Sequence, residues 1–182
     1  MEFEVLTTER LLLRKFTPEG FNYLFDNYSK DEVKDQLGLA TDEEVIKEKE
    51  KCKGGYSTYD RTIVHFKLIV KETNEVIGGC GYHNWYPGHS KAELGYVLTR
   101  DENKRKGYMS EAISTILEYG FNFMHLNRIE ACIGPGNIAS LSLIRKYGFT
   151  QEGYLRQHFI RDGKIEDSMI FSLLKEEYEG KK

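Results

Sequence analysis

Apolar side chains recur at three- and four-residue steps between Tyr108 and Met124, which is the period of a helix with one buried face. The repeating positions are Met109, Ala112, Ile113, Ile116, Leu117, Phe123 and Met124. Three further helices are predicted, from Pro18 to Tyr28, from Thr41 to Tyr59 and from Asn137 to Tyr147. Gly148 follows the last of these, and a glycine commonly ends a helix. About four helices are therefore expected.

Segments rich in β-branched and aromatic residues predict about seven strands. They are Arg10 to Phe16, Ile63 to Lys71, Glu75 to Trp85, Lys91 to Thr99, Arg128 to Ile133, Phe149 to Ile160 and Lys164 to Leu174. Asp162-Gly163 favours a two-residue hairpin turn between the last two, because both positions of that turn need positive φ. The early strands form a meander and the later ones alternate with helices. This order predicts an α/β fold with a mixed, largely antiparallel central sheet.

The composition mainly excludes other classes of protein and partner. The length fits one domain, so residues 1–182 are expected to form a single unit. Apolar residues make up 40% and charged residues 30% of the chain, which excludes disordered and fibrous classes. A formal charge of −3 creates no overall positive field, so neither nucleic acid nor an acidic membrane is expected as a partner. Any anion-binding patch must be local.

The cysteines and the N-terminal segment bear on the compartment. Cys52, Cys80 and Cys132 are far apart in sequence and no histidine stands at zinc-ligand spacing, so no metal is expected. Free thiols are typical of a reducing environment. The apolar run from Leu11 to Leu13 is too short for a signal peptide or a membrane span. These features predict a cytoplasmic protein.

The turn before the long helix has the chemistry of an anion site. It reads Asn103-Lys104-Arg105-Lys106-Gly107-Tyr108-Met109. A helix N-terminus presents backbone N–H groups without internal partners and a partial positive charge, and both favour phosphate. Gly107 permits the backbone to approach a ligand closely. The residue order excludes a P-loop, and an exposed basic turn without a ligand is the alternative explanation.

A second glycine turn fits the G-x-G-x-x-A pattern of dinucleotide-binding turns. It is Gly134-Pro135-Gly136-Asn137-Ile138-Ala139, between a predicted strand and a predicted helix. A dinucleotide fold needs further parallel strands and an acidic residue at the end of the next strand. Here Glu152 stands at the beginning of its strand, and a hairpin follows. A plain glycine turn is therefore favoured over a dinucleotide site.

Several short motifs follow one another in a characteristic order. They are Thr8-Glu9-Arg10-Leu11, Ala92-Glu93-Leu94-Gly95-Tyr96, Gly107-Tyr108-Met109-Ser110-Glu111-Ala112, Asn127-Arg128-Ile129-Glu130-Ala131, Asn137-Ile138-Ala139-Ser140, Gly148-Phe149 and Phe171-Ser172-Leu173-Leu174. Together they resemble the GNAT superfamily of acetyltransferases, in particular its RimJ/RimL-type branch, which includes acetylases of ribosomal-protein N-termini. The resemblance implies a GNAT-like fold, acetyl-coenzyme A as acetyl donor and an amine as acceptor. That amine is either a protein N-terminus, including a ribosomal one, or a small molecule, and a homodimer is left open.

The resemblance also implies where coenzyme A lies. The family pattern Q/R-x-x-G-x-G/A for the pyrophosphate loop falls on Lys104, Gly107 and Met109, so two of its three positions depart from it. Backbone N–H groups, which such changes leave in place, hold most of the phosphate. The pantetheine arm is expected beside the strand from Lys91 to Thr99, where Gly95 suits either a close approach or a bulge. The expected contacts are Val97, Leu98, Thr99, Lys104, Arg105, Lys106, Gly107, Tyr108, Met109, Ser110, Asn137 and Ser140.

Acetyl transfer to an amine needs a base, an oxyanion donor and an acid for the departing thiolate. Glu93 is the candidate base, acting directly or through water, and a structural carboxylate is the alternative. The tyrosine acid of many GNAT members falls on Ile144, so that acid is missing. Ser140 resembles the serine that some relatives use instead. Asn137 is expected to cap its helix, and a backbone N–H near Leu98 to stabilise the oxyanion.

His83 and Asn84 stand at the end of a predicted strand that leads into the expected cleft. They are expected to line the acceptor site, with His83 as a second candidate base. The leading hypothesis is an N-acetyltransferase that works by direct attack in a ternary complex. A non-catalytic sensor of coenzyme A or a nucleotide on the same fold is the alternative, and a dinucleotide enzyme built on Gly134 to Ala139 is the third.

Overall fold

The computed structural model describes residues 2–53, 55 and 57–180, and its centre is one sheet of eight strands. The strands are β1 (Val5–Thr7), β2 (Leu11–Phe16), β3 (Thr62–Val70), β4 (Val76–Tyr86), β5 (Lys91–Leu98), β6 (Arg128–Ile133), β7 (Thr150–Arg161) and β8 (Lys164–Leu174). They lie in the order β1-β2-β3-β4-β5-β6-β8-β7, and only β5 and β6 run parallel. This confirms the predicted α/β class with a mixed, largely antiparallel sheet.

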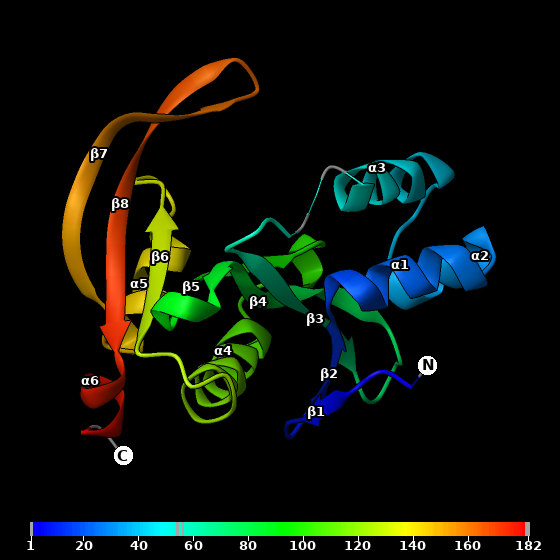
Figure 1. The fold of residues 1–182 in the computed structure, drawn as a ribbon, viewed down its shortest axis with the longest axis horizontal. Coiled ribbons are helices and arrows are strands. Elements are labelled where there is room, and N and C mark those ends of the chain that lie inside the picture. The colour runs from blue at the N-terminus through cyan, green and yellow to red at the C-terminus, as the bar shows by residue number, and fades with distance from the viewer. Residues whose placement is uncertain (1, 54, 56, 181–182) are drawn as a thin grey trace.

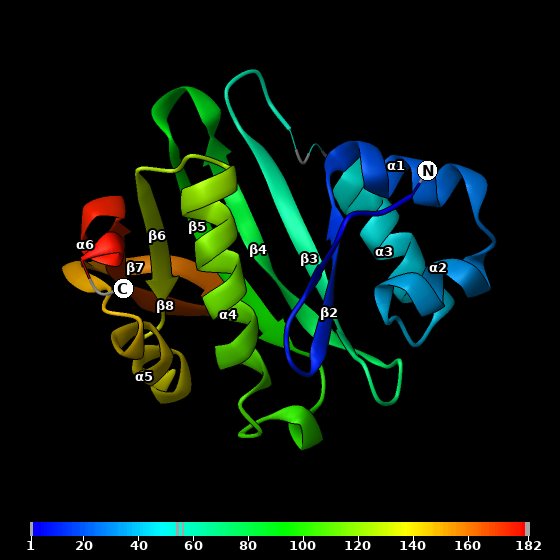
Figure 2. The ribbon, with the colours of Figure 1, turned by 90° about the horizontal axis from the view of Figure 1, so that it is seen from below.

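The helices cover the two faces of the sheet. They are α1 (Pro18–Asn27), α2 (Lys30–Leu37), α3 (Asp42–Lys53), α4 (Tyr108–Glu118), α5 (Ile138–Lys146) and α6 (Lys175–Glu179). Figure 1 shows α1, α2 and α3 grouped at the end of the sheet that carries β2 and β3, and Figure 2 shows α4 lying across the central strands. No helix in the described part of the chain is long and apolar enough to span a membrane.

Alternation along β2 explains why two separate cores form. Leu11 and Leu13 point to one face and join the large core under α4, whereas Phe16 points to the other face and packs with α1 to α3. Phe21 and Leu24 of α1 complete that smaller core together with apolar residues of α2 and α3. The sheet is therefore fixed from both sides at its N-terminal half.

The structure differs from the predicted elements in two ways: some short elements were not predicted, and two helices end elsewhere. Strand β1 and helices α2 and α6 were not predicted, so the sheet has eight strands instead of about seven. Helix α3 ends at Lys53 instead of Tyr59, and residues 54 and 56 of the predicted segment lie outside the described residues. The predicted helix from Tyr108 to Met124 continues past α4 as a wider turn, Tyr119–Phe123. There the buried Tyr82 hydroxyl donates to the Ile116 carbonyl over 2.8 Å, and such insertions widen helices.

An ion-pair network fixes the start of the β7–β8 hairpin to β6. Arg128 donates to both carboxylate oxygens of Glu152, over 2.8 and 2.6 Å, and also to Glu130 over 2.7 Å. Ser172 of β8 donates to Glu152 over 2.5 Å. The hydrogen bonds from Arg128 and Ser172 lower the pKa of Glu152 to about 2. The network thus joins three neighbouring strands.

Glu152→Gln is expected to lower the melting temperature at pH 7 by about 2–4 °C, which corresponds to ~1 kcal/mol for a partly exposed ion pair in a chain of this size. A depressed pKa stabilises the fold fully above the ordinary carboxyl range and loses that effect as pH falls toward about 2. The gap between wild type and variant should therefore narrow between pH 5 and pH 3. Melting curves by circular dichroism test this, and a gap that stays constant over that range would contradict it.

Candidate active site

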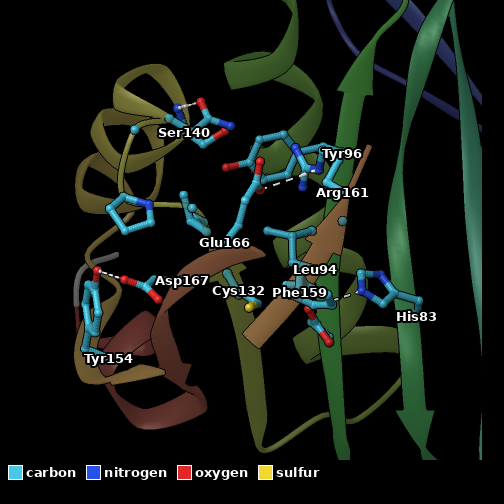
Figure 3. A pocket seen from close by; sticks show the side chains of 18 residues that line it. His83, Leu94, Tyr96, Cys132, Ser140, Tyr154, Phe159, Arg161, Glu166 and Asp167 are labelled. Carbon is cyan, nitrogen blue, oxygen red and sulfur yellow. Dashed lines mark hydrogen bonds and ion pairs between the residues drawn. The ribbon is translucent and has the colours of Figure 1, made fainter. Parts of the chain in front are cut away.

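The parallel pair β5 and β6 opens halfway along its length. Strands β5 and β6 pair from Lys91 with Arg128 to Glu93 with Glu130, and no pairing continues beyond that point in the described residues. A cavity of about 840 Å³ lies at this opening, and Figure 3 shows side chains from both strands and from the β7–β8 hairpin directed into it. Its lining includes Glu93, Tyr96, Cys132, Asn137 and Ser140. The opening exposes a length of β5 to ligands.

A second, smaller cavity of about 330 Å³ lies between α3 and the sheet. Phe21, Ile63 and Val97 give it apolar walls, and Glu48 and Lys51 of α3 stand at its side. The two cavities share three lining residues, His83, Gly95 and Tyr96. Molecules that enter from the two sides would therefore meet at the middle of β5.

Glu93 stands at this meeting point with two side-chain partners from β4. Its Oε1 lies 3.2 Å from His83 Nε2, and its Oε2 accepts a hydrogen bond of 2.9 Å from Asn84. Asn84 in turn accepts one from Arg61 over 3.1 Å. Burial favours the neutral acid, but the contacts with His83 and Asn84 outweigh it and hold the pKa of Glu93 below its ordinary value. Glu93 is therefore ionised at neutral pH.

Gly95 is required by the position of the His83 ring. It pairs in regular register with Gly81 of β4, so the alternative of a bulge at Gly95 is wrong. The register shift lies instead between His83 and Tyr86. A Cβ on Gly95 would come within 2.8 Å of the imidazole, and any side chain there would displace His83.

The start of α5 brings two predicted residues to the cavity. Asn137 is the N-cap of α5, as predicted, and its side chain accepts a hydrogen bond of 3.1 Å from the Ser140 backbone N–H. Ser140 lines the larger cavity. Across from it, Tyr96 of β5 extends its hydroxyl toward Ser140 in Figure 3. Ile144, one turn further along α5, is fully buried.

The turn before α4 has an unusual backbone that the N-terminal strands support. Gly107 is the N-cap of α4 at φ +84°, and Arg105 also has a positive φ of +60°. The Arg10 guanidinium donates to the Lys106 carbonyl over 2.9 Å and stacks 4.6 Å from the centre of the Tyr108 ring. Glu111 in the first turn of α4 accepts from the Arg10 side chain over 2.7 Å. These long-range contacts fix the conformation of the turn at the helix N-terminus.

Comparison with known proteins places this arrangement in a family. Residues 10–150 match the model of the acetyltransferase (GNAT) domain. The chain belongs to the GNAT acetyltransferase family. The resemblance found in the sequence is thereby confirmed, and the chain is an acyltransferase of the N-acetyltransferase type.

Relatives cover between about two thirds and nearly all of this GNAT chain. An uncharacterized N-acetyltransferase of Bacillus licheniformis, p20, is 37% identical over 178 residues, 97% of this chain and 99% of its own. A putative ribosomal N-acetyltransferase of Bacillus subtilis, YdaF, is 34% identical over 136 residues, 69% of this chain and 74% of its own. The crystal structure of a GNAT acetyltransferase from Bacillus anthracis matches with a TM-score of 0.67 at 28% identity, over 95% of this chain and 99% of that one.

The two residues that depart from the GNAT loop pattern, Lys104 and Met109, make contacts within the protein. Lys104 pairs with Asp101 over 2.5 Å, and Met109 is buried in the large core. Ser110 accepts a hydrogen bond of 2.5 Å from Lys146, and its carbonyl accepts one from Tyr147, so it joins α4 to the end of α5. The side chains of Lys104 and Ser110 are thus partly engaged within the protein.

The remaining predicted contact residues lie at the end of β5 and in the turn before α4. Val97 is exposed on β5, Leu98 ends β5, and Thr99 donates to the Ile77 carbonyl over 3.2 Å. Lys106 contributes the carbonyl that Arg10 holds. The predicted residues therefore fall into two groups, one around the α4 N-terminus and one at the opening between β5 and β6.

The β7–β8 hairpin supplies one wall of the larger cavity. Tyr154 donates to Asp167 over 2.6 Å, and Arg161 lies 3.6 Å from Glu166 (Figure 3). Phe159 adds an apolar side chain. Both strands of this hairpin and the turn at Asp162-Gly163 were predicted from the sequence, and the structure shows which of their side chains reach the cavity.

The dinucleotide hypothesis finds less support in the fold. The turn from Gly134 to Gly136 leads from β6 to α5, but β6 has a single parallel neighbour, β5, and an antiparallel one, β8. A dinucleotide site needs further parallel strands beside it. Among the described residues no cluster of His, Cys, Asp and Glu is arranged to hold a metal ion.

Proposed function

We propose that this chain transfers an acetyl group from acetyl-coenzyme A to a primary amine, by direct attack within a ternary complex. The observation that carries the proposal is the pair of cavities that share His83, Gly95 and Tyr96. A donor in the larger cavity and an acceptor in the smaller one would bring thioester and amine together beside Glu93. We also propose that the described fold acts as one acetyltransferase domain.

The donor fits the features around α4 and β5. The turn at Gly107 offers backbone N–H groups at a helix N-terminus, with Arg105 and Lys106 beside it, which suits the pyrophosphate. Beyond Glu93, the edge of β5 that faces β6 has no strand partner in the described residues and offers backbone groups to the amides of the pantetheine arm. Asn137 and Ser140 would face the thioester end. Lys104 is assigned a minor part because Asp101 pairs with it.

The acceptor amine must lose one proton while the thiolate gains one. Glu93, ionised at neutral pH, would accept the proton of the attacking nitrogen directly or through water, and His83 and Asn84 would orient its carboxylate. The C–N bond forms, the C–S bond breaks, and Ser140 would face the departing sulfur. A backbone N–H near Leu98 would stabilise the oxyanion.

The acceptor class is either a protein N-terminus or a small-molecule amine. Two relatives point to proteins by name, the putative ribosomal acetyltransferase YdaF and the alanine acetyltransferase of ribosomal protein uS5 in Escherichia coli, 31% identical over 110 residues. The apolar walls of the smaller cavity, Phe21, Ile63 and Val97, favour an acceptor with an apolar group next to its amine. The cytoplasm, where both donor and ribosomes occur, is the proposed compartment.

A thiol-release assay tests the proposal. The protein is incubated with acetyl-coenzyme A and a panel of N-terminal peptides, lysine peptides, polyamines and aminoglycosides. Turnover with at least one acceptor class is expected, and mass spectrometry of the product locates the acetyl group. Thermal stabilisation by coenzyme A without any turnover would favour the sensor, and stabilisation by NAD alone would favour the dinucleotide enzyme.

A further inference from the structure

The Tyr96 hydroxyl is a buried polar group without a hydrogen bond. Its oxygen is shielded from solvent, and no described residue provides it with a hydrogen-bond partner of acceptable geometry. A buried hydroxyl left unpaired costs free energy, and native proteins retain very few of them. Such an atom at the wall of a ligand cavity calls for a functional explanation.

Ser140 is the polar side chain toward which this hydroxyl is directed. Figure 3 shows the Tyr96 ring between the opening of the sheet and the start of α5, with its hydroxyl end toward Ser140. Burial raises the pKa of the Tyr96 phenol, and the proximity of Ser140 partly opposes that rise. Tyr96 thus stays protonated at neutral pH, and its O–H is available to donate.

Alternation along β5 separates the two kinds of chemistry. Leu94 and Tyr96 pack on the large core under α4 and α5, whereas Glu93 and Gly95 point to the opposite face, where Glu93 contacts His83 and Asn84. The proton acceptor and the Tyr96 hydroxyl therefore lie on opposite faces of one strand. In a direct attack the nucleophile approaches from one side of the carbonyl carbon and the leaving group departs from another.

We infer that Tyr96 is a positioning residue that acts through Ser140 on the leaving thiolate, a role that rests on the proposed function. When the donor occupies the cavity, the Tyr96 O–H donates to Ser140 Oγ. The Ser140 O–H is then oriented toward the sulfur, and it donates more strongly because its oxygen accepts a hydrogen bond. A serine hydroxyl alone is a poor acid, and this pair supplies the assistance that the apolar Ile144 cannot give.

The chemistry balances without a further reactant. The thiolate formed by C–S cleavage is stabilised by the hydrogen bond from Ser140, and its final proton is the one released by the acceptor nitrogen. Tyr96 keeps its own proton throughout, in agreement with a buried phenol. Its hydroxyl only gains a hydrogen bond, to Ser140 Oγ.

A double-mutant cycle tests the inference. Thiol release is measured for wild type, Tyr96→Phe, Ser140→Ala and the double variant, together with the melting temperature of each. Y96F is expected to lower kcat about ten-fold with KM for acetyl-coenzyme A within about two-fold, since one hydrogen bond is lost from the leaving-group step. In the S140A background the same change should alter kcat less than about two-fold, because the residues act as one unit.

Stability separates this role from a structural one. Y96F removes a hydroxyl that has no partner, so the melting temperature should stay unchanged or rise. Tyr119→Phe is the matched control, since Tyr119 is buried, contacts Lys15 and lies outside the cavities. It should leave kcat unchanged.

Three results would overturn the inference while leaving the proposed function intact. They are a kcat of Y96F within about two-fold of wild type, equal losses from Y96F in both backgrounds, or a rate loss that follows a lowered melting temperature. Where S140A falls below detection, the single Y96F variant decides by the same criterion. Absence of turnover in the wild type would overturn the proposed function itself.

Discussion

Gly107→Asp is expected to weaken the binding of coenzyme A by at least about a hundred-fold. Three effects act together. Gly107 has φ +84°, which a side chain tolerates poorly, and a Cβ would lie 3.2 Å from Arg10 Nη2. The new carboxylate would also stand where the pyrophosphate is proposed to lie, and like charges in contact cost several kcal/mol. Isothermal titration with coenzyme A measures the loss.

Two variants make this result specific. Gly163→Asp places the same residue at a glycine of similar φ, +75°, in the hairpin turn between β7 and β8, where a Cβ meets nothing within 4 Å. It should retain normal affinity. Lys104→Ala removes a charge that Asp101 already pairs with, so it should weaken binding only about two- to three-fold. Normal affinity in the Gly107 variant would mean that the phosphates bind elsewhere.

Glu93→Gln is expected to lower kcat by about a hundred- to ten-thousand-fold at pH 7, the range that general-base catalysis supplies. The amide keeps the size of the side chain, so the fold should be retained. Because the pKa of Glu93 lies below its ordinary value, its own titration leaves the wild-type rate unaffected near neutrality. The fall of the wild-type rate at low pH then reflects protonation of the acceptor amine, whose pKa is ~8 for an N-terminus or ~10.4 for a lysine.

The pH dependence of the Glu93 deficit tests the role of the carboxylate. As pH rises through the pKa of the acceptor amine, the amine deprotonates by itself and the gap between wild type and variant should narrow. Glu130→Gln is the matched control, because Glu130 lies opposite Glu93 in register but pairs with Arg128 and Lys91. It should retain kcat within about two-fold. A deficit of equal size at every pH would point to an orienting role for Glu93.

Periodicity predicted the elements that carry long, regular patterns. The strands from β2 to β8 and the long helix at α4 were all found, because each repeats its pattern over at least six residues. Helix α2 was missed because only Val33 and Leu37 of its residues are buried, too few to show a period. Its capping box, Ser29 with Glu32, was the available signal.

Contacts between distant segments were beyond a single sequence. The turn at Gly107 was located from local residues, but nothing in its surroundings indicated that Arg10, almost a hundred positions away, would hold it. Similarly, Tyr96 reads from the sequence as an ordinary strand aromatic. The role proposed for it rests on a hydroxyl that the fold leaves without a partner, and this is visible only in three dimensions.

The separation of β5 from β6 creates a sheet edge inside the molecule. Edges at the outside of a sheet attract other chains and promote aggregation, and proteins protect them with charges or prolines. Here β8 and β7 continue the sheet beyond the gap, and α5 begins beside it. An internal edge of this kind admits a flexible arm as narrow as one extended chain but excludes a second folded protein. The gap between β5 and β6 can thus select ligands by thickness without allowing the sheet to associate edge to edge with another chain.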